Sequence, residues 1–258
     1  AAHFKAYAAA GVNRISFGVQ SMSPRVLQAL GRDHHPETVV EAVALARSGG
    51  IERLNLDLIY GGAGETLQDW EFTLEQVIDL SPDHVSAYAL TVEAGTPLAD
   101  DPSRHPDDDD QADKYLLADS MLSSAGFTNY EISNWAKPNN ECAHNLLYWR
   151  QGDYLGFGCA AHSHRSGRRW WNVRTPERYI DLIQSNDSAE ASAEDLDPER
   201  RRIEGLQLSL RTREGVPADS LSTSDRELLE PLIVIDGENL VLSTEGRLLA
   251  NEVAIRLR

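Results

Sequence analysis

Polar side chains lie in or at the ends of strand-like runs in the N-terminal part of the chain. The runs are Val12–Gln20, Leu54–Gly61 and His84–Val92, and their polar residues are Gln20, Asp57 and Thr91. A carboxylate accepts hydrogen bonds and an amide both donates and accepts them, so these groups can bind hydroxyl and amine groups of a small molecule. Active sites of β/α barrels lie at the carboxyl ends of the strands. We therefore expect a ligand site where these runs end.

Helical patterns separate the three runs. N-cap signals precede two of the helices, at Ser23 and Thr66. Strands and helices that alternate with short connections favour right-handed βαβ crossovers and a parallel sheet. Three strands cannot close a barrel, so the predicted fold is α/β with an incomplete parallel β/α barrel. The expected helices are Ala1–Gly11, Arg25–Leu30, Pro36–Gly49 and Thr66–Ser81.

The polar segment Asp100–Asp110 predicts a domain boundary. It ends in four consecutive aspartates, which suit a solvated linker or a helix N-terminus. We assign residues 1–100 to the later part of the barrel and residues 101–258 to a smaller α+β domain, which begins with a helix at Gln111–Ser124 and a strand at Thr128–Ser133. Residues 224–256 follow the order helix, strand, turn, strand and helix of a winged helix, for which we expect a structural role.

The composition excludes several classes of partner. Acidic residues outnumber basic ones by 41 to 24, and the formal charge of −17 disfavours binding to nucleic acid or to an anionic membrane. No apolar run reaches the roughly 20 residues that span a bilayer, and the N-terminus has no signal-peptide pattern, so we expect a cytoplasmic protein. Cys142 and Cys159 are expected to be free thiols.

Several segments resemble one known family. Gly18-Val19-Gln20-Ser21, Leu30-Gly31-Arg32 and Leu56-Asp57-Leu58-Ile59-Tyr60-Gly61 are similar, in order and spacing, to radical S-adenosylmethionine (SAM) proteins of the oxygen-independent coproporphyrinogen III oxidase group. The segment from His144 to His162 resembles the HemW branch of that group, the heme chaperones. The resemblance covers nearly the whole chain. It implies a partial TIM barrel of the radical SAM type, followed by the C-terminal domain of the group.

The resemblance also implies that Gln20, Arg32 and Asp57 contact SAM. Arg32 can pair with the carboxylate of the ligand through its planar guanidinium group. Asp57 can accept hydrogen bonds from ribose hydroxyls, and Gln20 can both donate and accept them. Isolated residues of these types more often cap strands or form surface salt bridges. Three matches in order favour the ligand role.

A [4Fe–4S] cluster is a further implication of the family, in which a Cys-x3-Cys-x2-Cys motif binds it. This motif is absent from the sequence, and Cys142 and Cys159 do not have its spacing. No other metal site is predicted. The chain resembles the family without its first barrel strands, so we do not expect these residues alone to cleave SAM.

The HemW resemblance implies heme contact for His144, Asn145, Tyr148 and Trp149. Histidine is a common iron ligand in heme proteins, and aromatic rings stack on a porphyrin. The alternative is that His144 and Trp149 pack at a domain interface. A basic and aromatic patch at Arg165–Trp171 either meets the propionates of a porphyrin or is a solvated loop edge.

The function implied by the resemblance is that of a heme chaperone, which binds heme and transfers it to acceptor proteins such as respiratory enzymes. Through such partners it would associate peripherally with membranes. The alternative function is enzymatic: oxygen-independent coproporphyrinogen III oxidase decarboxylates propionate side chains in porphyrin biosynthesis. The motif from His144 to Trp149 belongs to the chaperone branch and favours the first function.

Overall fold

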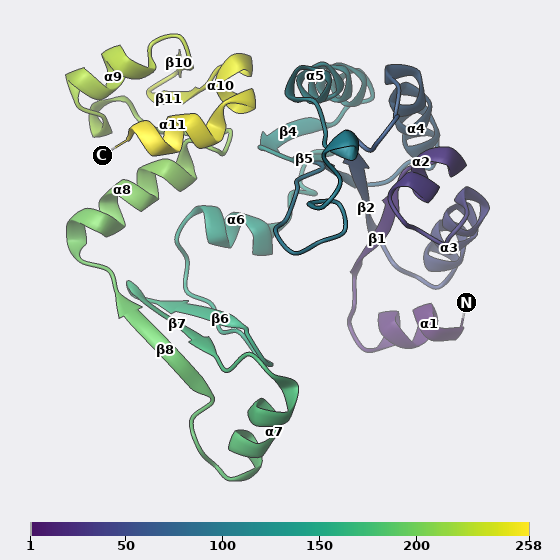
Figure 1. Cartoon of the computed structure of the whole chain (residues 1–258), viewed down its shortest axis with the longest axis horizontal. Coiled ribbons are helices and arrows are strands. Elements are labelled where there is room, and N and C mark those ends of the chain that lie inside the picture. The colour runs from purple at the N-terminus through teal and green to yellow at the C-terminus, as the bar shows by residue number, and fades with distance from the viewer. Residues whose placement is uncertain (1, 258) are drawn as a thin grey trace. The chain divides into compact units, whose positions relative to one another are not determined.

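A computed structural model describes residues 2–257 of the chain (Figure 1). Ala1, at the start of the predicted N-terminal helix, and Arg258, at the end of the predicted second domain, lie outside the described residues. The chain divides into two compact units, Ala1–Glu141 and Cys142–Arg258. This division does not follow the boundary at residue 100 that the composition predicts.

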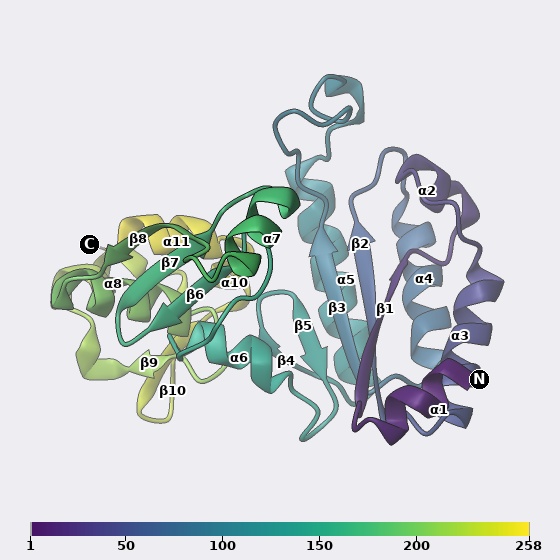
Figure 2. The same cartoon turned by 90° about the horizontal axis from the view of Figure 1, so that it is seen from below.

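The first unit contains a five-stranded sheet in the order β1-β2-β3-β5-β4. Strands β1, β2 and β3 are parallel, as predicted, and β5 runs antiparallel to β3. Helices α2, α3 and α4 lie along one side of the parallel strands (Figure 2). The elements are α1 (Ala2–Ala9), β1 (Arg14–Gln20), α2 (Pro24–Ala29), α3 (Pro36–Ser48), β2 (Arg53–Tyr60), α4 (Leu67–Asp79), β3 (His84–Ala89), the 3-10 turn Pro102–Arg104, α5 (Asp108–Ser124), β4 (Thr128–Glu131) and β5 (Asn134–Ala136).

The alternation of apolar and polar residues in β2 decides what each face of the sheet carries. Leu54, Leu56 and Leu58 are fully buried and belong to the hydrophobic core. Asn55 and Asp57 point to the other face, because successive side chains of a strand alternate in direction. The parallel strands therefore have one apolar face and one polar face.

Packing of α5 explains why the first compact unit extends beyond residue 100. The acidic run forms the N-terminus of this helix, where the Asp107 side chain accepts a hydrogen bond from the Asp110 backbone N–H at 2.9 Å. Helix α5 packs on α4, and the hairpin of β4 and β5 extends the barrel sheet. Residues 101–141 are therefore part of the first unit. Composition marks a solvated helix start but not the tertiary contacts that follow it.

The second unit contains two three-stranded antiparallel sheets, in the orders β6-β7-β8 and β10-β11-β9. The second of these sheets, with α9 and α10, forms the predicted winged-helix-like segment. The expected final helix is interrupted at Leu249, which separates α10 from α11. The elements are α6 (Ala143–Trp149), β6 (His162–Arg165), β7 (Arg168–Asn172), α7 (Pro176–Gln184), β8 (Glu190–Asp195), α8 (Pro198–Ser209), β9 (Val216–Pro217), the 3-10 turn Ala218–Ser220, α9 (Thr223–Leu229), β10 (Ile233–Asp236), β11 (Asn239–Leu242), α10 (Thr244–Leu248) and α11 (Ala250–Arg256).

Within residues 2–257, every helix is too short or too polar to cross a bilayer.

Candidate functional site

A pocket of about 710 Å³ opens at the carboxyl ends of the parallel strands. Gln20 comes from the last position of β1, Asp57 from β2 and Thr91 from the segment after β3. The structure thus brings together the three polar residues that the strand pattern singles out. The lining residues are Gln20, Asp57, Ile59, Tyr88, Ala89, Leu90, Thr91 and Ser133. Tyr88 and Ser133 carry polar groups that the sequence pattern did not indicate.

Gln20 adopts an unusual backbone conformation at the rim of this pocket. Its φ of 64° lies in the left-handed region, and the pairing of β1 with β2 shifts register between Gly18 and Gln20. Such a conformation costs a non-glycine residue on the order of 1–3 kcal/mol. A Cβ atom on Gly18 would lie only 2.8 Å from Gln20 Nε2, so glycine at this position makes room for the amide. The bend therefore turns the amide back over the end of β1.

Asp57 is held by hydrogen bonds to both carboxylate oxygens. Its Oδ2 atom accepts from Ser16 Oγ, and its Oδ1 atom accepts from Asn55 Nδ2 at 2.7 Å. Asn55 Oδ1 lies 2.6 Å from His84 Nδ1, and His84 Nε2 lies 2.8 Å from the Tyr130 hydroxyl. The carboxylate thus ends a network on the polar face of the sheet.

Arg32 is placed differently from Gln20 and Asp57. It follows α2, is exposed and does not line the pocket. Its backbone N–H donates to Leu27 O at 2.9 Å. The nearby His34 ring contacts Val19 O through Nε2 at 2.9 Å, which ties this loop to the end of β1. A contact between Arg32 and a ligand stays a prediction.

The residues of the described part of the chain do not supply the ligands of an iron–sulfur cluster. Residues 2–257 contain no group of three or more His, Cys, Asp or Glu side chains that could hold a metal ion. Cys142 and Cys159 are not joined in a disulfide, and both are partly exposed. Metal chemistry therefore contributes no step to what we derive from these residues.

Helix α6 presents the second predicted site in the second unit. His144 and Tyr148 are exposed, whereas Asn145 and Trp149 are partly buried. His144 Nε2 lies 2.9 Å from the Tyr148 hydroxyl, and the two rings meet edge to face with centroids 4.8 Å apart. The spacing of four residues places both side chains on one face of the helix. The Trp149 indole nitrogen is buried and has no hydrogen-bond partner within residues 2–257.

Aromatic rings continue from α6 to the sheet of β6, β7 and β8. Tyr148 packs edge to face on Tyr154, at a centroid distance of 4.6 Å, and Tyr154 approaches His164 at 6.1 Å. His162 stacks on Trp171 at 5.7 Å. The rings of His144, Tyr148, Tyr154 and His164 therefore form one series from α6 to β6, and His162 and Trp171 form a separate pair.

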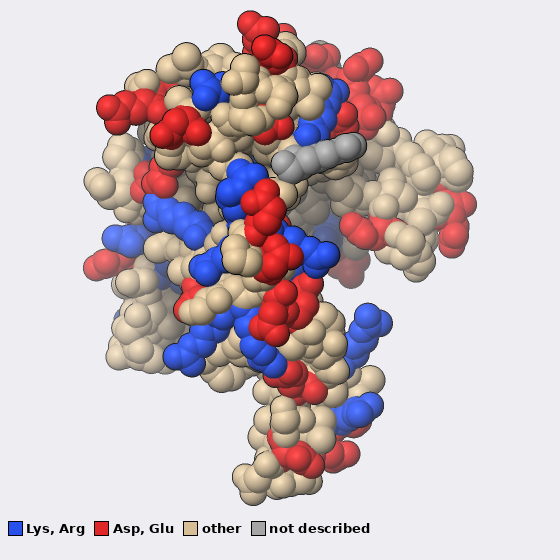
Figure 3. Space-filling model, turned by 90° about the vertical axis from the view of Figure 1, so that its left-hand side faces the viewer, with Lys and Arg blue, Asp and Glu red and all other residues tan. Residues whose placement is uncertain are grey.

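The arginines of the predicted basic patch are largely neutralised. Arg168 pairs with Glu190 at 2.6 Å, and Arg169 pairs with Glu194 at 2.8 Å and with Glu204 at 3.0 Å. On the face of the molecule seen in Figure 3, basic and acidic side chains are intermixed. Two of the patch's arginines are thus already engaged by carboxylates, which weakens their case as anion-binding groups.

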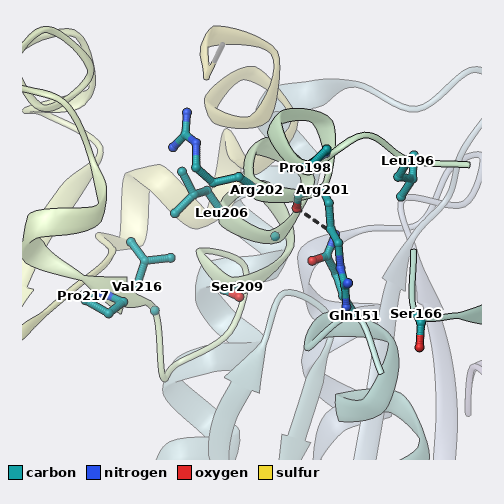
Figure 4. A pocket seen from close by; sticks show the side chains of 12 residues that line it. Gln151, Ser166, Leu196, Pro198, Arg201, Arg202, Leu206, Ser209, Val216 and Pro217 are labelled. Atoms are coloured by element: carbon teal, nitrogen blue, oxygen red, sulfur yellow. Dashed lines mark hydrogen bonds between the residues drawn. The ribbon is translucent and has the colours of Figure 1, made fainter. Parts of the chain in front are cut away.

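A second pocket, of about 630 Å³, lies beside α8 in the second unit (Figure 4). Its lining includes none of the residues predicted to contact SAM or heme. Gln151 Nε2 donates to Arg201 O at 3.1 Å, and Arg202 pairs with Glu199 at 2.8 Å. The lining residues are Gln151, Ser166, Leu196, Pro198, Arg201, Arg202, Gly205, Leu206, Ser209, Gly215, Val216 and Pro217.

Comparison with known proteins identifies relatives of this chain. A family model described as the radical SAM superfamily matches residues 1–77. The heme chaperone HemW of Mycobacterium tuberculosis strain H37Rv is 41% identical over 97% of this chain, and the chain spans 66% of that protein's length. HemW of Bacillus subtilis is 35% identical over 95% of the chain, which covers 69% of that protein.

A solved structure shares the fold. Coproporphyrinogen III oxidase (HemN) from Escherichia coli, a radical SAM enzyme, superposes with a TM-score of 0.82 at 21% identity, over 99% of this chain and 66% of that one. This likeness confirms the predicted α/β architecture. The extent and identity of the match to the bacterial chaperones go further, and they show that the chain belongs to the HemW family of the radical SAM superfamily.

Proposed function

We propose that this chain acts in a heme chaperone, with a SAM pocket in its first unit and a heme-contacting helix in its second. The observation that carries the proposal is the similarity to HemW proteins over 95–97% of the chain. The residues of both predicted sites lie inside the matched region. The activity of the whole protein is part of this proposal, because the chain spans 66% of the mycobacterial relative.

The pocket in the first unit suits an adenosyl ligand. SAM carries a carboxylate, an amine, ribose hydroxyls and a sulfonium group. The ionised Asp57 carboxylate would accept from hydroxyl or amine groups, and the Gln20 amide would donate and accept beside it. Ile59 and Leu90 add apolar surface. A volume of about 710 Å³ lies within the usual range for small-molecule pockets of about 300–1,000 Å³.

Heme is the proposed cargo of α6. An exposed imidazole can bind iron, and neighbouring aromatic rings can lie against the porphyrin. The hydrogen bond between His144 and Tyr148 would restrict the orientation of the imidazole, leaving His144 Nδ1 as the nitrogen free to bind iron. Transfer to acceptor proteins such as respiratory enzymes, peripheral membrane association through them and a cytoplasmic location belong to the same proposal.

Coproporphyrinogen III oxidation is the competing function. The likeness to HemN supports a common fold, but 21% identity does not carry an activity. The two functions differ in what α6 must recognise. A chaperone binds the iron of heme, whereas an oxidase binds a metal-free tetrapyrrole through its carboxylates.

Titration with three tetrapyrroles tests the proposal. We expect hemin to bind saturably at one equivalent, with a shift of its Soret band, and protoporphyrin IX and coproporphyrin III to bind at least tenfold more weakly. The variant His144→Ala should weaken hemin binding, whereas His3→Ala, on the exposed face of α1, should not. Equal affinity for the three compounds, or an unchanged His144→Ala variant, would contradict the chaperone assignment. Tighter binding of coproporphyrin III would favour the oxidase.

A further inference from the structure

The polar face of the barrel sheet carries buried side chains directly behind Asp57. His84 and Ser86 are 2% exposed, Tyr130 is 5% exposed and Asn55 is 8% exposed. They come from β2, β3 and β4. Burial of polar groups is costly unless they are hydrogen-bonded. A contiguous group of this kind, next to a pocket, therefore calls for a physical explanation.

The ionised carboxylate fixes the direction of the hydrogen bonds in this group. Asp57 can only accept, so Asn55 must present its Nδ2 amide, which lies 2.7 Å from Asp57 Oδ1. Asn55 Oδ1 then faces His84 Nδ1 at 2.6 Å, so this nitrogen must carry the proton. His84 Nε2 is left as an acceptor for the Tyr130 hydroxyl at 2.8 Å. Along this path each donor points toward Asp57, and Asn55 Nδ2 also lies within hydrogen-bond distance of Ser16 Oγ, at 2.8 Å, and of Ser86 Oγ, at 2.9 Å.

The environment of His84 suits a neutral ring, which donates one hydrogen bond and accepts another. Burial, and secondarily the positive charge of Arg14, lower the pKa of His84 to about 3. A charged imidazolium would donate from both nitrogens, so the Tyr130 hydroxyl oxygen would have to accept from Nε2 instead of donating to it. The ring is therefore neutral at physiological pH and can keep one tautomer.

We infer that Asn55 and His84 are positioning residues for the ligand site: a one-way chain from Tyr130 through His84 and Asn55 orients the Asp57 carboxylate toward the pocket. This inference rests on the proposed SAM site. Ser16 secures the second carboxylate oxygen from β1. With both oxygens held on the protein side, the remaining lone pairs of the carboxylate are left for the ligand. Preorganisation of this kind lowers the entropy cost of binding.

The tautomer of His84 provides a test that needs no ligand. In ¹⁵N nuclear magnetic resonance spectra of the unliganded chain, we expect His84 in the neutral Nδ1–H form, because Asn55 Oδ1 requires a donor. The Nε2–H form, or rapid exchange between the two forms, would overturn the chain of donors whether or not SAM binds.

A double-mutant cycle tests the coupling to Asp57. By calorimetry, Asn55→Leu should weaken SAM binding about tenfold, the size expected for loss of a hydrogen bond to a charged group. In an Asp57→Asn background the same substitution should change affinity less than twofold, because the charge to be oriented is gone. Equal losses in both backgrounds would indicate a general structural role and would overturn the inference.

Conservative replacement of the ring gives a second comparison. The amide of His84→Asn can mimic the Nδ1 donor, so this variant should retain more SAM affinity than His84→Leu at equal thermal stability. Equal affinities of the two variants would contradict the inference. If the wild-type protein binds hemin but not SAM, SAM is not the ligand of the pocket. The tautomer measurement would still show whether the hydrogen bonds from Tyr130 to Asp57 run in the inferred direction.

Discussion

The two candidate sites differ in how the fold holds their side chains. Asp57 projects from β2, where the adjacent residues Leu56 and Leu58 are fully buried. Hydrogen bonds hold both oxygens of its carboxylate. His144 projects from a seven-residue helix that has no buried residue, and its ring is steadied by the Tyr148 hydroxyl. The first arrangement is preorganised for a ligand of constant shape. The second is an exposed surface, which suits a cargo that must also be released.

The largest effect is expected at the buried cation that supports the first unit. Lys114 is fully buried, and its ammonium group donates to Glu65 O at 2.9 Å and lies 3.6 Å from Glu65 Oε2. Lys114→Ala would leave the Glu65 carboxylate buried without this partner, which costs about 3–5 kcal/mol. Chemical denaturation should show this loss, and Lys5→Ala, on the exposed side of α1, is the control. A loss below 1 kcal/mol would mean that water or another group replaces the cation.

Removal of the carboxylate should separate the two sites. We expect Asp57→Ala to weaken SAM binding about a hundredfold, because charge-assisted hydrogen bonds to the ligand are lost. Hemin binding should be unchanged. Calorimetry with SAM and absorbance titration with hemin check both parts. A parallel loss of hemin affinity would show that the sites are not independent.

The reciprocal change is His144→Ala. Loss of an iron ligand should weaken hemin binding about tenfold or more and shift the Soret band, with SAM affinity unchanged. The matched control is His162→Ala, which removes another exposed imidazole of the same unit. An equal spectral shift in both variants would argue against a specific role for α6.

The buried histidine predicts how stability depends on pH. The pKa of His84 in the folded state is about 3, below the unfolded value of about 6.5, so unfolding takes up a proton between these values. The contribution of His84 to the free energy of unfolding is complete above pH 6.5 and is lost as the pH falls toward 3. The free energy of unfolding then changes by up to about 1.4 kcal/mol per pH unit. Denaturation curves at pH 6.5 and 5.5 should show a smaller difference for His84→Asn than for the wild type. The same difference in both proteins would contradict this assignment.

The smallest effect is expected for Tyr148→Phe. The substitution removes the hydroxyl that contacts His144 but keeps the ring on Tyr154. Because the pair is exposed, we expect hemin affinity to fall only about threefold. Tyr154→Phe, which changes no hydrogen bond to His144, serves as the comparison. A loss as large as that of His144→Ala would mean that the phenol itself binds the iron.

Sequence patterns predicted the helices and strands of the barrel better than the residue at which the first unit ends. The strand-like run Leu54–Gly61 and the helix signals at Ser23 and Thr66 are local features of the sequence, and the corresponding elements were confirmed. The first compact unit extends past the predicted boundary at residue 100, because α5 packs on α4 and joins segments that composition treats as separate. The family resemblance also grouped Arg32 with Gln20 and Asp57, whereas only Gln20 and Asp57 of these three line the pocket.

By itself, the sequence determined the family, the strand-end residues of the pocket and the absence of a three-cysteine motif, because these depend on residue identity and short-range order. The tertiary structure decided which buried groups support those residues. Tyr130 and His84 lie 46 positions apart, and His84 and Asn55 lie 29 apart. Asn55 and His84 come within hydrogen-bond distance because β2 pairs with β3, and Tyr130 reaches His84 from β4, which β5 separates from β3. Long-range pairing of strands leaves no local signal in the chain, and it was this pairing that oriented the Asp57 carboxylate.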